Sequence, residues 1–199
     1  MILACTSGHD RARAVHPIRL RSPVRHTGDV TTQQPIEERS PAAPVHICFV
    51  CTGNICRSPM AALVFERHLA DAGLADRVKV TSAGVGRWHV GDPADSRARA
   101  TLRAAGYSDD HVAAQLGPAH DDADLFVVAT TSHLHDVREF SGPDADPDRI
   151  VLLREFDPSA PPNAEVPDPY YGGDDGFTDV LGMIERAMPQ LLDWVRKRL

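Results

Sequence analysis

The sequence lacks any apolar stretch long enough to cross a lipid bilayer. Its longest unbroken apolar runs, at 47–51 and 125–129, fall far short of the roughly 20 residues that a transmembrane helix needs. The N-terminal region also lacks the apolar core of a secretory signal, because arginines interrupt it at Arg11, Arg13, Arg19, Arg21 and Arg25. We therefore expect a cytoplasmic protein with no membrane partner. Export without a signal peptide stays open on the sequence alone.

Basic charge is also scarce. The 199 residues hold 21 Lys and Arg against 28 Asp and Glu, which gives a formal net charge of -7. The first 44 residues carry six Arg against four acidic groups, so residues 45–199 carry 15 basic against 24 acidic groups. A nucleic-acid backbone calls for a basic face, so we expect no nucleic-acid partner. Any phosphate must be bound by a local arrangement of hydrogen-bond donors.

Cysteine is too sparse for a metal site. Cys48 and Cys51 have the C-x-x-C spacing, but residues i and i+3 on a strand point to opposite faces of a sheet. They form a poor redox pair or zinc knuckle, and no second cysteine pair exists. We expect no bound metal, and we interpret Cys48 as a small buried hydrophobic residue.

The chain divides near residue 44. Residues 1–44 contain five prolines and no helical or strand periodicity, so we predict a disordered N-terminal extension. A functional tail, a cleaved leader and a translation start assigned too far upstream all fit. The abrupt beginning of the compact pattern at Val45 favours the last. Residues 45–199 can bury roughly two thirds of their unfolded surface, enough for one independent domain.

From Val45 onward, strand and helix patterns alternate. Ser58 is a predicted helix cap, Pro59 a first helical residue, and Gly73 and Gly106 helix ends. The pattern predicts an α/β fold with an open four-stranded parallel sheet and helices on both faces, with the functional site at the carboxyl ends of the strands. The strands are expected at 45–50, 77–82, 124–130 and 149–153, and the helices at 59–72, 95–105, 132–140 and 176–198.

A short loop joins the first strand to the first helix and carries the candidate chemistry. It reads Cys51-Thr52-Gly53-Asn54-Ile55-Cys56-Arg57-Ser58. A loop that feeds a helix N-terminus directs backbone N–H groups and the positive end of the helix dipole inward, which suits a phosphate dianion. These donors favour the thiolate form of Cys51, so we assign it as a nucleophile. Arg57 can hold two phosphate oxygens with its planar guanidinium.

The run from Val50 to Pro59 resembles the C-x5-R-S signature of low-molecular-weight protein tyrosine phosphatases, and the resemblance extends over residues 45–199. A second segment, Asp168-Pro169-Tyr170-Tyr171-Gly172, is similar to the general-acid loop of that family. Actinobacterial members are the most similar, given the run Trp88-His89-Val90-Gly91. The resemblance implies a phosphatase I-like fold and hydrolysis of phosphotyrosine through a phosphocysteine, with no cofactor.

The resemblance also implies roles for individual residues. Cys51 would be the nucleophile, Arg57 the phosphate clamp and Asp168 the general acid and base. On spacing alone, Asp168 fits an ordinary surface turn better, and only the resemblance reverses that interpretation. The other positions carried over are the phosphate-binding loop Thr52, Gly53, Asn54, Ile55, Cys56 and Ser58, the supporting residues Ser82 and His111, and the specificity residues Trp88, Tyr170 and Tyr171.

Two kinds of regulation follow from these positions. Tyr170 and Tyr171 are phosphorylated in relatives, which implies a tyrosine kinase as a partner besides the phosphotyrosine-containing substrate proteins. Cys51 and Cys56 lie on one tight loop, so oxidation can join them as a disulfide, although a purely structural Cys56 fits equally well.

The sequence departs from the family pattern at two places near the loop. Thr130 stands where relatives usually have Asp, and Ala62 replaces a common Glu. Neither change touches the nucleophile, the arginine or the acid. We expect Thr130 to cap the helix that follows it.

Three rival functions share this scaffold. A thioredoxin-coupled arsenate reductase needs two further cysteines, which are missing after Cys56, but a reductase that uses a low-molecular-weight thiol stays open. Protein arginine phosphatases have Thr where Ile55 stands, and the apolar side chain disfavours a guanidinium-bearing substrate. A non-catalytic phosphotyrosine-binding module would be expected to have lost Cys51, Arg57 or Asp168, and all three are present.

Overall fold

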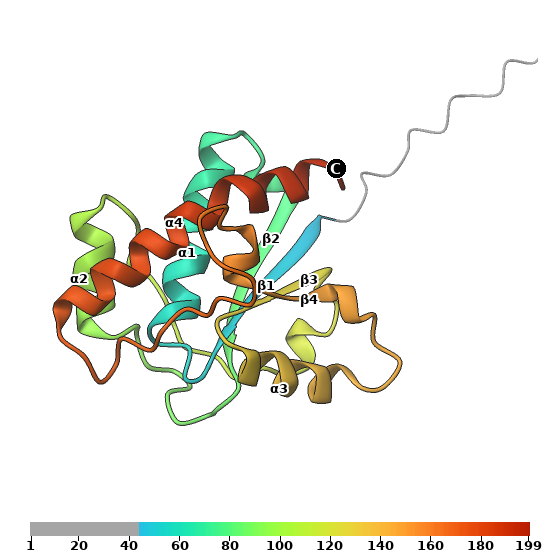
Figure 1. Ribbon diagram of the computed structural model, residues 1–199, viewed down its shortest axis with the longest axis horizontal. Helices are drawn as coiled ribbons and strands as arrows, with labels where there is room; N and C mark the ends of the chain where they lie inside the picture. The colour runs from blue at the N-terminus through green and yellow to red at the C-terminus, as the bar shows by residue number, and fades with distance from the viewer. Residues whose placement is uncertain (1–43) are drawn as a thin grey trace, which may run out of the picture. The chain divides into compact units, whose positions relative to one another are not determined.

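The computed structural model describes residues 44–199. The disordered extension predicted at 1–44 therefore lies, apart from Pro44, outside the described residues. Four parallel strands form one sheet in the order β2-β1-β3-β4 (Figure 1), as the alternating pattern predicts. The strands are β1 (Val45–Cys51), β2 (Val78–Gly84), β3 (Leu125–Val128) and β4 (Ile150–Leu152).

Helices cover both faces of this sheet (Figure 1). They are α1 (Arg57–Asp71), α2 (Ser96–Ala104), α3 (Thr131–Ser141) and α4 (Asp174–Arg196). Buried residues of α1, α2 and α4 share one hydrophobic cluster, and α3 contributes to a second cluster on the other face. No helix within residues 44–199 is long and apolar enough to cross a membrane.

Strand β1 supplies side chains to both clusters because successive residues of a strand point to opposite faces. Ile47, Phe49 and Cys51 belong to the cluster beneath α1 and α4, whereas Cys48 and Val50 belong to the cluster beneath α3. The prediction that Cys48 and Cys51 face opposite ways is confirmed. Cys51 thus begins the loop toward α1 with its side chain on the α1 face.

The helix ends agree with the glycine signals but not with the predicted serine cap. Gly73 and Gly106 have φ values of 68 and 82 degrees, which non-glycine residues adopt at a cost. The predictions that Ser58 caps the first helix and that Pro59 is its first residue are wrong, because the helix begins at Arg57 and no side chain of the described part of the chain caps it. The Ser58 hydroxyl bonds within the preceding loop instead. Thr130 caps α3 through the His133 backbone N–H, as expected.

Candidate active site

The loop between β1 and α1 is held in shape by the buried side chain of Asn54. Asn54 has a φ of 56 degrees, a left-handed conformation that Asn tolerates better than most residues. Its amide nitrogen donates to the hydroxyls of Ser58 and Ser82, both at 2.9 Å. Its amide oxygen accepts the backbone N–H of Ala114 at 2.8 Å. One side chain thereby ties the loop to α1, β2 and the segment after α2.

His111 supports the same residue from outside. Its Nε2 lies 2.8 Å from the carbonyl oxygen of Asn54, which can only accept, so Nε2 carries the proton. Burial lowers the pKa of His111, which keeps the ring neutral. The structure therefore brings Asn54, Ser58, Ser82 and His111 into one connected network, although they come from distant parts of the sequence.

Cys51 lies at the floor of this loop and is 2% exposed. Its Sγ is 2.9 Å from the Ser58 hydroxyl oxygen. That oxygen already accepts from Asn54, so its own proton is available for donation. The alternative acceptor, the Ala83 carbonyl, is farther away at 3.4 Å. The Ser58 hydroxyl is therefore the donor that holds the Cys51 sulfur in place.

Arg57 follows the loop at the start of α1 and is 5% exposed. Its Nη2 donates to the Thr52 hydroxyl at 3.1 Å and to Asp168 Oδ2 at 3.0 Å, and its Nη1 donates to the Val166 carbonyl at 3.3 Å. The Arg57 Nε is buried and has no hydrogen-bond partner among residues 44–199. A buried N–H of a charged group without an acceptor is costly, and a phosphate oxygen would satisfy it.

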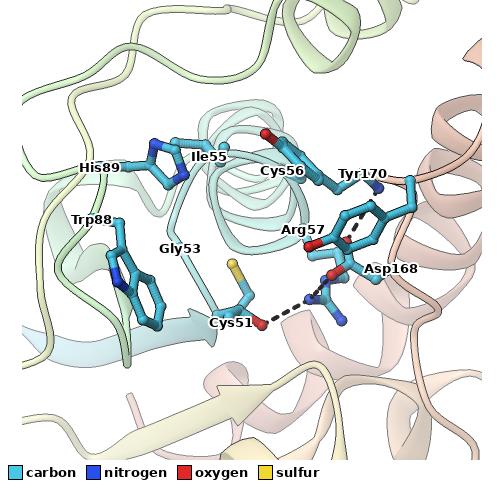
Figure 2. A pocket seen from close by; sticks show the side chains of 11 residues that line it. Cys51, Gly53, Ile55, Cys56, Arg57, Trp88, His89, Asp168 and Tyr170 are labelled. Atoms are coloured by element: carbon cyan, nitrogen blue, oxygen red, sulfur yellow. Dashed lines mark hydrogen bonds and ion pairs between the residues drawn. The ribbon is translucent and has the colours of Figure 1, made fainter.

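Asp168 reaches the loop from the opposite end of the chain, a separation of 111 residues from Arg57. Its Oδ1 accepts the backbone N–H of Tyr170 at 3.2 Å while Oδ2 pairs with Arg57. The side chain is 39% exposed, so it is open to a ligand that enters the site. The structure thus places Cys51, Arg57 and Asp168 around one cavity (Figure 2).

This cavity has a volume of about 380 Å³. Figure 2 shows Trp88 on one side and Tyr170 with Asp168 on the other, with the Cys51 sulfur between them. Trp88 is 74% exposed and Tyr171 is 90% exposed, so large aromatic side chains form a solvent-facing rim. The lining residues are Cys51, Thr52, Gly53, Ile55, Cys56, Arg57, Trp88, His89, Asp168, Tyr170 and Tyr171.

Two residues next to the site were not identified from the sequence. His133 is buried, with Nε2 2.9 Å from the Thr52 hydroxyl and Nδ1 2.8 Å from the Thr130 hydroxyl. Burial, reinforced by the nearby Arg57 charge, lowers the pKa of His133 to about 4. His89 lines the cavity beside Gly53. Its place in the Trp88-His89-Val90-Gly91 run was the available sequence signal, whereas His133 lies 81 residues from Thr52 with no linking pattern.

Cys56 is buried beside the loop, and burial raises the pKa of its thiol to about 12. The thiol therefore stays protonated near neutral pH, unlike an attacking thiolate. Within residues 44–199, no group of three or more His, Cys, Asp or Glu side chains is arranged to hold a metal ion. The thiol of Cys51, the guanidinium of Arg57 and the carboxyl group of Asp168 all line the cavity.

The chain is similar in sequence to proteins of one known family. Residues 46–199 match the family described as low molecular weight phosphotyrosine protein phosphatase. The chain is 50% identical over 157 residues to low molecular weight protein-tyrosine phosphatase A of Mycobacterium tuberculosis. The aligned region covers 78% of this chain and 94% of that protein. This similarity confirms the expected likeness to actinobacterial members.

Two solved structures have a fold similar to that of this chain. The crystal structure of YfkJ from Bacillus subtilis superposes with a TM-score of 0.73 at 32% identity, and covers 80% of this chain and 99% of that one. The YwlE arginine phosphatase from Geobacillus stearothermophilus superposes with a TM-score of 0.66 at 29% identity, and covers 78% of this chain and 95% of that one. The arrangement of strands and helices in this chain is therefore similar to that of both solved structures.

Proposed function

The chain belongs to the family of low molecular weight phosphotyrosine protein phosphatases and is a protein tyrosine phosphatase, and we propose that it works through a covalent phosphocysteine formed on Cys51. Its substrates are phosphotyrosine-containing proteins. The unpaired, buried Nε of Arg57 carries the proposal most directly, because Arg57 and Cys51 line the same cavity. We assign the catalytic domain to residues 45–199.

In the first step, the Cys51 sulfur attacks phosphorus in line with the departing tyrosine oxygen. The loop N–H groups and the Arg57 guanidinium hold the equatorial phosphate oxygens as negative charge develops on them. A bound phosphate dianion competes with Asp168 for the Arg57 donors, which releases the carboxyl group toward the leaving oxygen. Asp168 carries the proton that it took from water in the preceding turnover. It gives this proton to the leaving oxygen, so that tyrosine departs as a neutral phenol.

In the second step, Asp168 acts as the base. It takes a proton from a water molecule, whose oxygen attacks the phosphocysteine and expels the Cys51 thiolate. Inorganic phosphate leaves and the site returns to its starting state. Every group in this cycle belongs to the chain itself.

The shape of the cavity supports phosphotyrosine over other phosphorylated side chains. Trp88 and Tyr170 stand as walls on either side of Cys51 (Figure 2), which suits the length and flat face of a phenyl ring. Phosphoserine is too short to bring its phosphorus to the sulfur between such walls. The apolar Ile55 side chain also lines the cavity and offers no acceptor to a phosphoarginine guanidinium.

Regulation is proposed at two places on the same site. Tyr171 is 90% exposed and Tyr170 is 41% exposed, so a tyrosine kinase can reach both hydroxyls. Peroxide would first oxidise Cys51 to a sulfenic acid, which the Cys56 thiol could then resolve as a disulfide. Because catalysis needs Cys51 reduced, we place the enzyme in the cytoplasm.

The mechanism is tested with two substitutions and two substrates. Cys51→Ser should abolish phosphate release and keep the binding of inorganic phosphate. Asp168→Ala should lower kcat/KM by about a hundredfold or more for phenyl phosphate, whose leaving group needs a proton. It should lower kcat/KM much less for dinitrophenyl phosphate, whose leaving group does not. Equal losses on both substrates would count against Asp168 as the general acid.

A further inference from the structure

Arg97, in the first turn of α2, holds the segment that carries Asp168. Its Nη2 donates to the carbonyl oxygen of Tyr170 and its Nη1 to the carbonyl oxygen of Gly172, both at 3.1 Å. The guanidinium also lies over two aromatic rings, 4.6 Å from the centre of the Phe177 ring and 5.7 Å from that of Tyr170. We call residues 166–172, which include Asp168, the acid-bearing segment. The Arg97 side chain fixes this segment to the start of α2.

The guanidinium is itself oriented by Asp95. Arg97 Nε and Nη2 donate to the two carboxylate oxygens of Asp95 at 3.0 and 2.9 Å, a two-pronged pair of fixed geometry. These bonds hold the pKa of Asp95 below its ordinary value. The backbone N–H of Asp95 donates to the Ile55 carbonyl at 2.8 Å. Arg97 is therefore connected to the phosphate-binding loop as well as to the acid-bearing segment.

The acid-bearing segment has a second attachment on its other side. The Val166 N–H donates to the Ala129 carbonyl at 2.9 Å, and the Val166 carbonyl accepts from Arg57 at 3.3 Å. Asp168 lies between this attachment and the one at Tyr170 and Gly172. Its neighbours Pro167 and Pro169 have no N–H to donate, so next to Asp168 the backbone can be anchored only through carbonyl groups.

We propose that Arg97 is a positioning residue for proton transfer, which fixes the Tyr170 to Gly172 end of the segment so that the Asp168 carboxyl meets the leaving oxygen. The proposal rests on the proposed role of Asp168 as the general acid. Loss of the two carbonyl bonds removes the attachment on the Tyr170 to Gly172 side, and the bonds at Glu165, Val166 and Asp168 remain. The carboxyl then samples positions too far from the leaving group, and a displacement of about 1 Å can cost on the order of a hundredfold in rate. Nucleophilic attack by Cys51 is untouched.

The test compares Arg97→Met with Arg99→Met in the full-length chain. Met keeps an apolar stem against Phe177 and removes every donor. Arg99 is the matched control, because it lies on the same helix and pairs with Asp109 at 2.8 Å rather than with the acid-bearing segment. Arg97→Lys is the second variant, since it keeps the positive charge and replaces the guanidinium with a single ammonium group on a shorter side chain. Each protein is assayed for kcat/KM on phenyl phosphate and on dinitrophenyl phosphate, and for inhibition by inorganic phosphate.

Arg97→Met should lose about tenfold or more in kcat/KM on phenyl phosphate and less than about twofold on dinitrophenyl phosphate. Inhibition by phosphate should not change, Arg97→Lys should recover part of the loss, and Arg99→Met should match the unsubstituted enzyme on both substrates. A merely structural role of Arg97 would lower kcat/KM on both substrates by the same factor. Equal losses on the two substrates, in whichever Arg97 variant folds, would overturn the proposal.

Asp168→Asn in the same series separates this proposal from the mechanism beneath it. Suppose that Asp168→Asn lowers kcat/KM mainly on phenyl phosphate while the Arg97 variants lower it equally on both substrates. In that case only the positioning role of Arg97 fails. If Asp168→Asn also affects both substrates equally, the assignment of the general acid fails, and the role of Arg97 fails with it.

Discussion

Thr52 connects two buried side chains from distant parts of the chain. Its hydroxyl oxygen accepts from Arg57 and lies 2.9 Å from Nε2 of His133. Since Arg57 can only donate, the Thr52 proton is free to point at a neutral His133 ring. Sequence reasoning identified Arg57 and Thr52 because both belong to one contiguous loop. It missed His133, because a contact across 81 residues leaves no local pattern.

The depressed pKa of His133 predicts a pH-dependent loss of stability. The unfolded chain binds a proton at His133 near pH 6.5, whereas the folded protein does so only near pH 4. The free energy of unfolding contributed by neutral His133 is therefore complete above pH 6.5. It falls by up to about 3 kcal/mol as the pH drops to 4.

Urea unfolding of the unsubstituted protein and of His133→Gln at several pH values isolates this contribution. His46 and His111 also have lowered pKa values, but they are present in both proteins and cancel in the difference. The difference in unfolding free energy should shrink as the pH falls from 7 to 4.5. A difference that stays constant over this range would show that His133 does not titrate as described.

The end of β2 is packed directly against the phosphate-binding loop. Gly84 pairs with Cys51 across the sheet. A Cβ at Gly84 would lie 2.9 Å from the carbonyl carbon of Gly53 and 3.0 Å from the Asn54 nitrogen and the Thr52 oxygen. These are backbone atoms that cannot rotate away. The glycine at this strand end is therefore needed for the loop to sit where it does.

Gly84→Ala should accordingly displace the loop and lower kcat/KM by about tenfold or more on any aryl phosphate. Unlike a change in the acid-bearing segment, this loss should not depend on the leaving group, and inhibition by phosphate should weaken with it. Gly182→Ala is the control, because its Cβ would come no closer than 3.5 Å to the Arg186 side chain inside α4. That variant should stay fully active and gain roughly 0.5–1 kcal/mol of stability. Normal activity in Gly84→Ala would refute the close approach.

At the scale of elements, the sequence predicts regular structure better than irregular structure. The four strands and four long helices follow from apolar runs, helix periodicity and helix-ending glycines, because these signals are local. The predicted cap at Ser58 is wrong for a reason the sequence does not display. The hydroxyl is bonded to Asn54 and Cys51, four and seven residues earlier in the chain, and a capping rule does not anticipate this competing use of the same side chain.

At the scale of the whole molecule, we propose that an acidic domain binds a dianion with one loop. Residues 45–199 carry an excess of acidic groups, so the overall field does not attract phosphate. We propose that the attraction comes instead from the backbone N–H groups between β1 and α1 and from buried Arg57. Because that loop is contiguous, the sequence alone indicates the chemistry. The acid, the aromatic walls and the supporting network come together only through the fold, so their placement needed the structure.

We propose that this site hydrolyses phosphotyrosine by way of Cys51. The most direct measurement is phosphate release by the full-length chain from matched phosphotyrosine, phosphoserine and phosphoarginine peptides, with Cys51→Ser as the blank. We expect phosphate from the phosphotyrosine peptide alone, and none above background from the other two or from Cys51→Ser. Comparable release from phosphoserine or phosphoarginine, turnover by Cys51→Ser, or no release from any peptide would contradict the account.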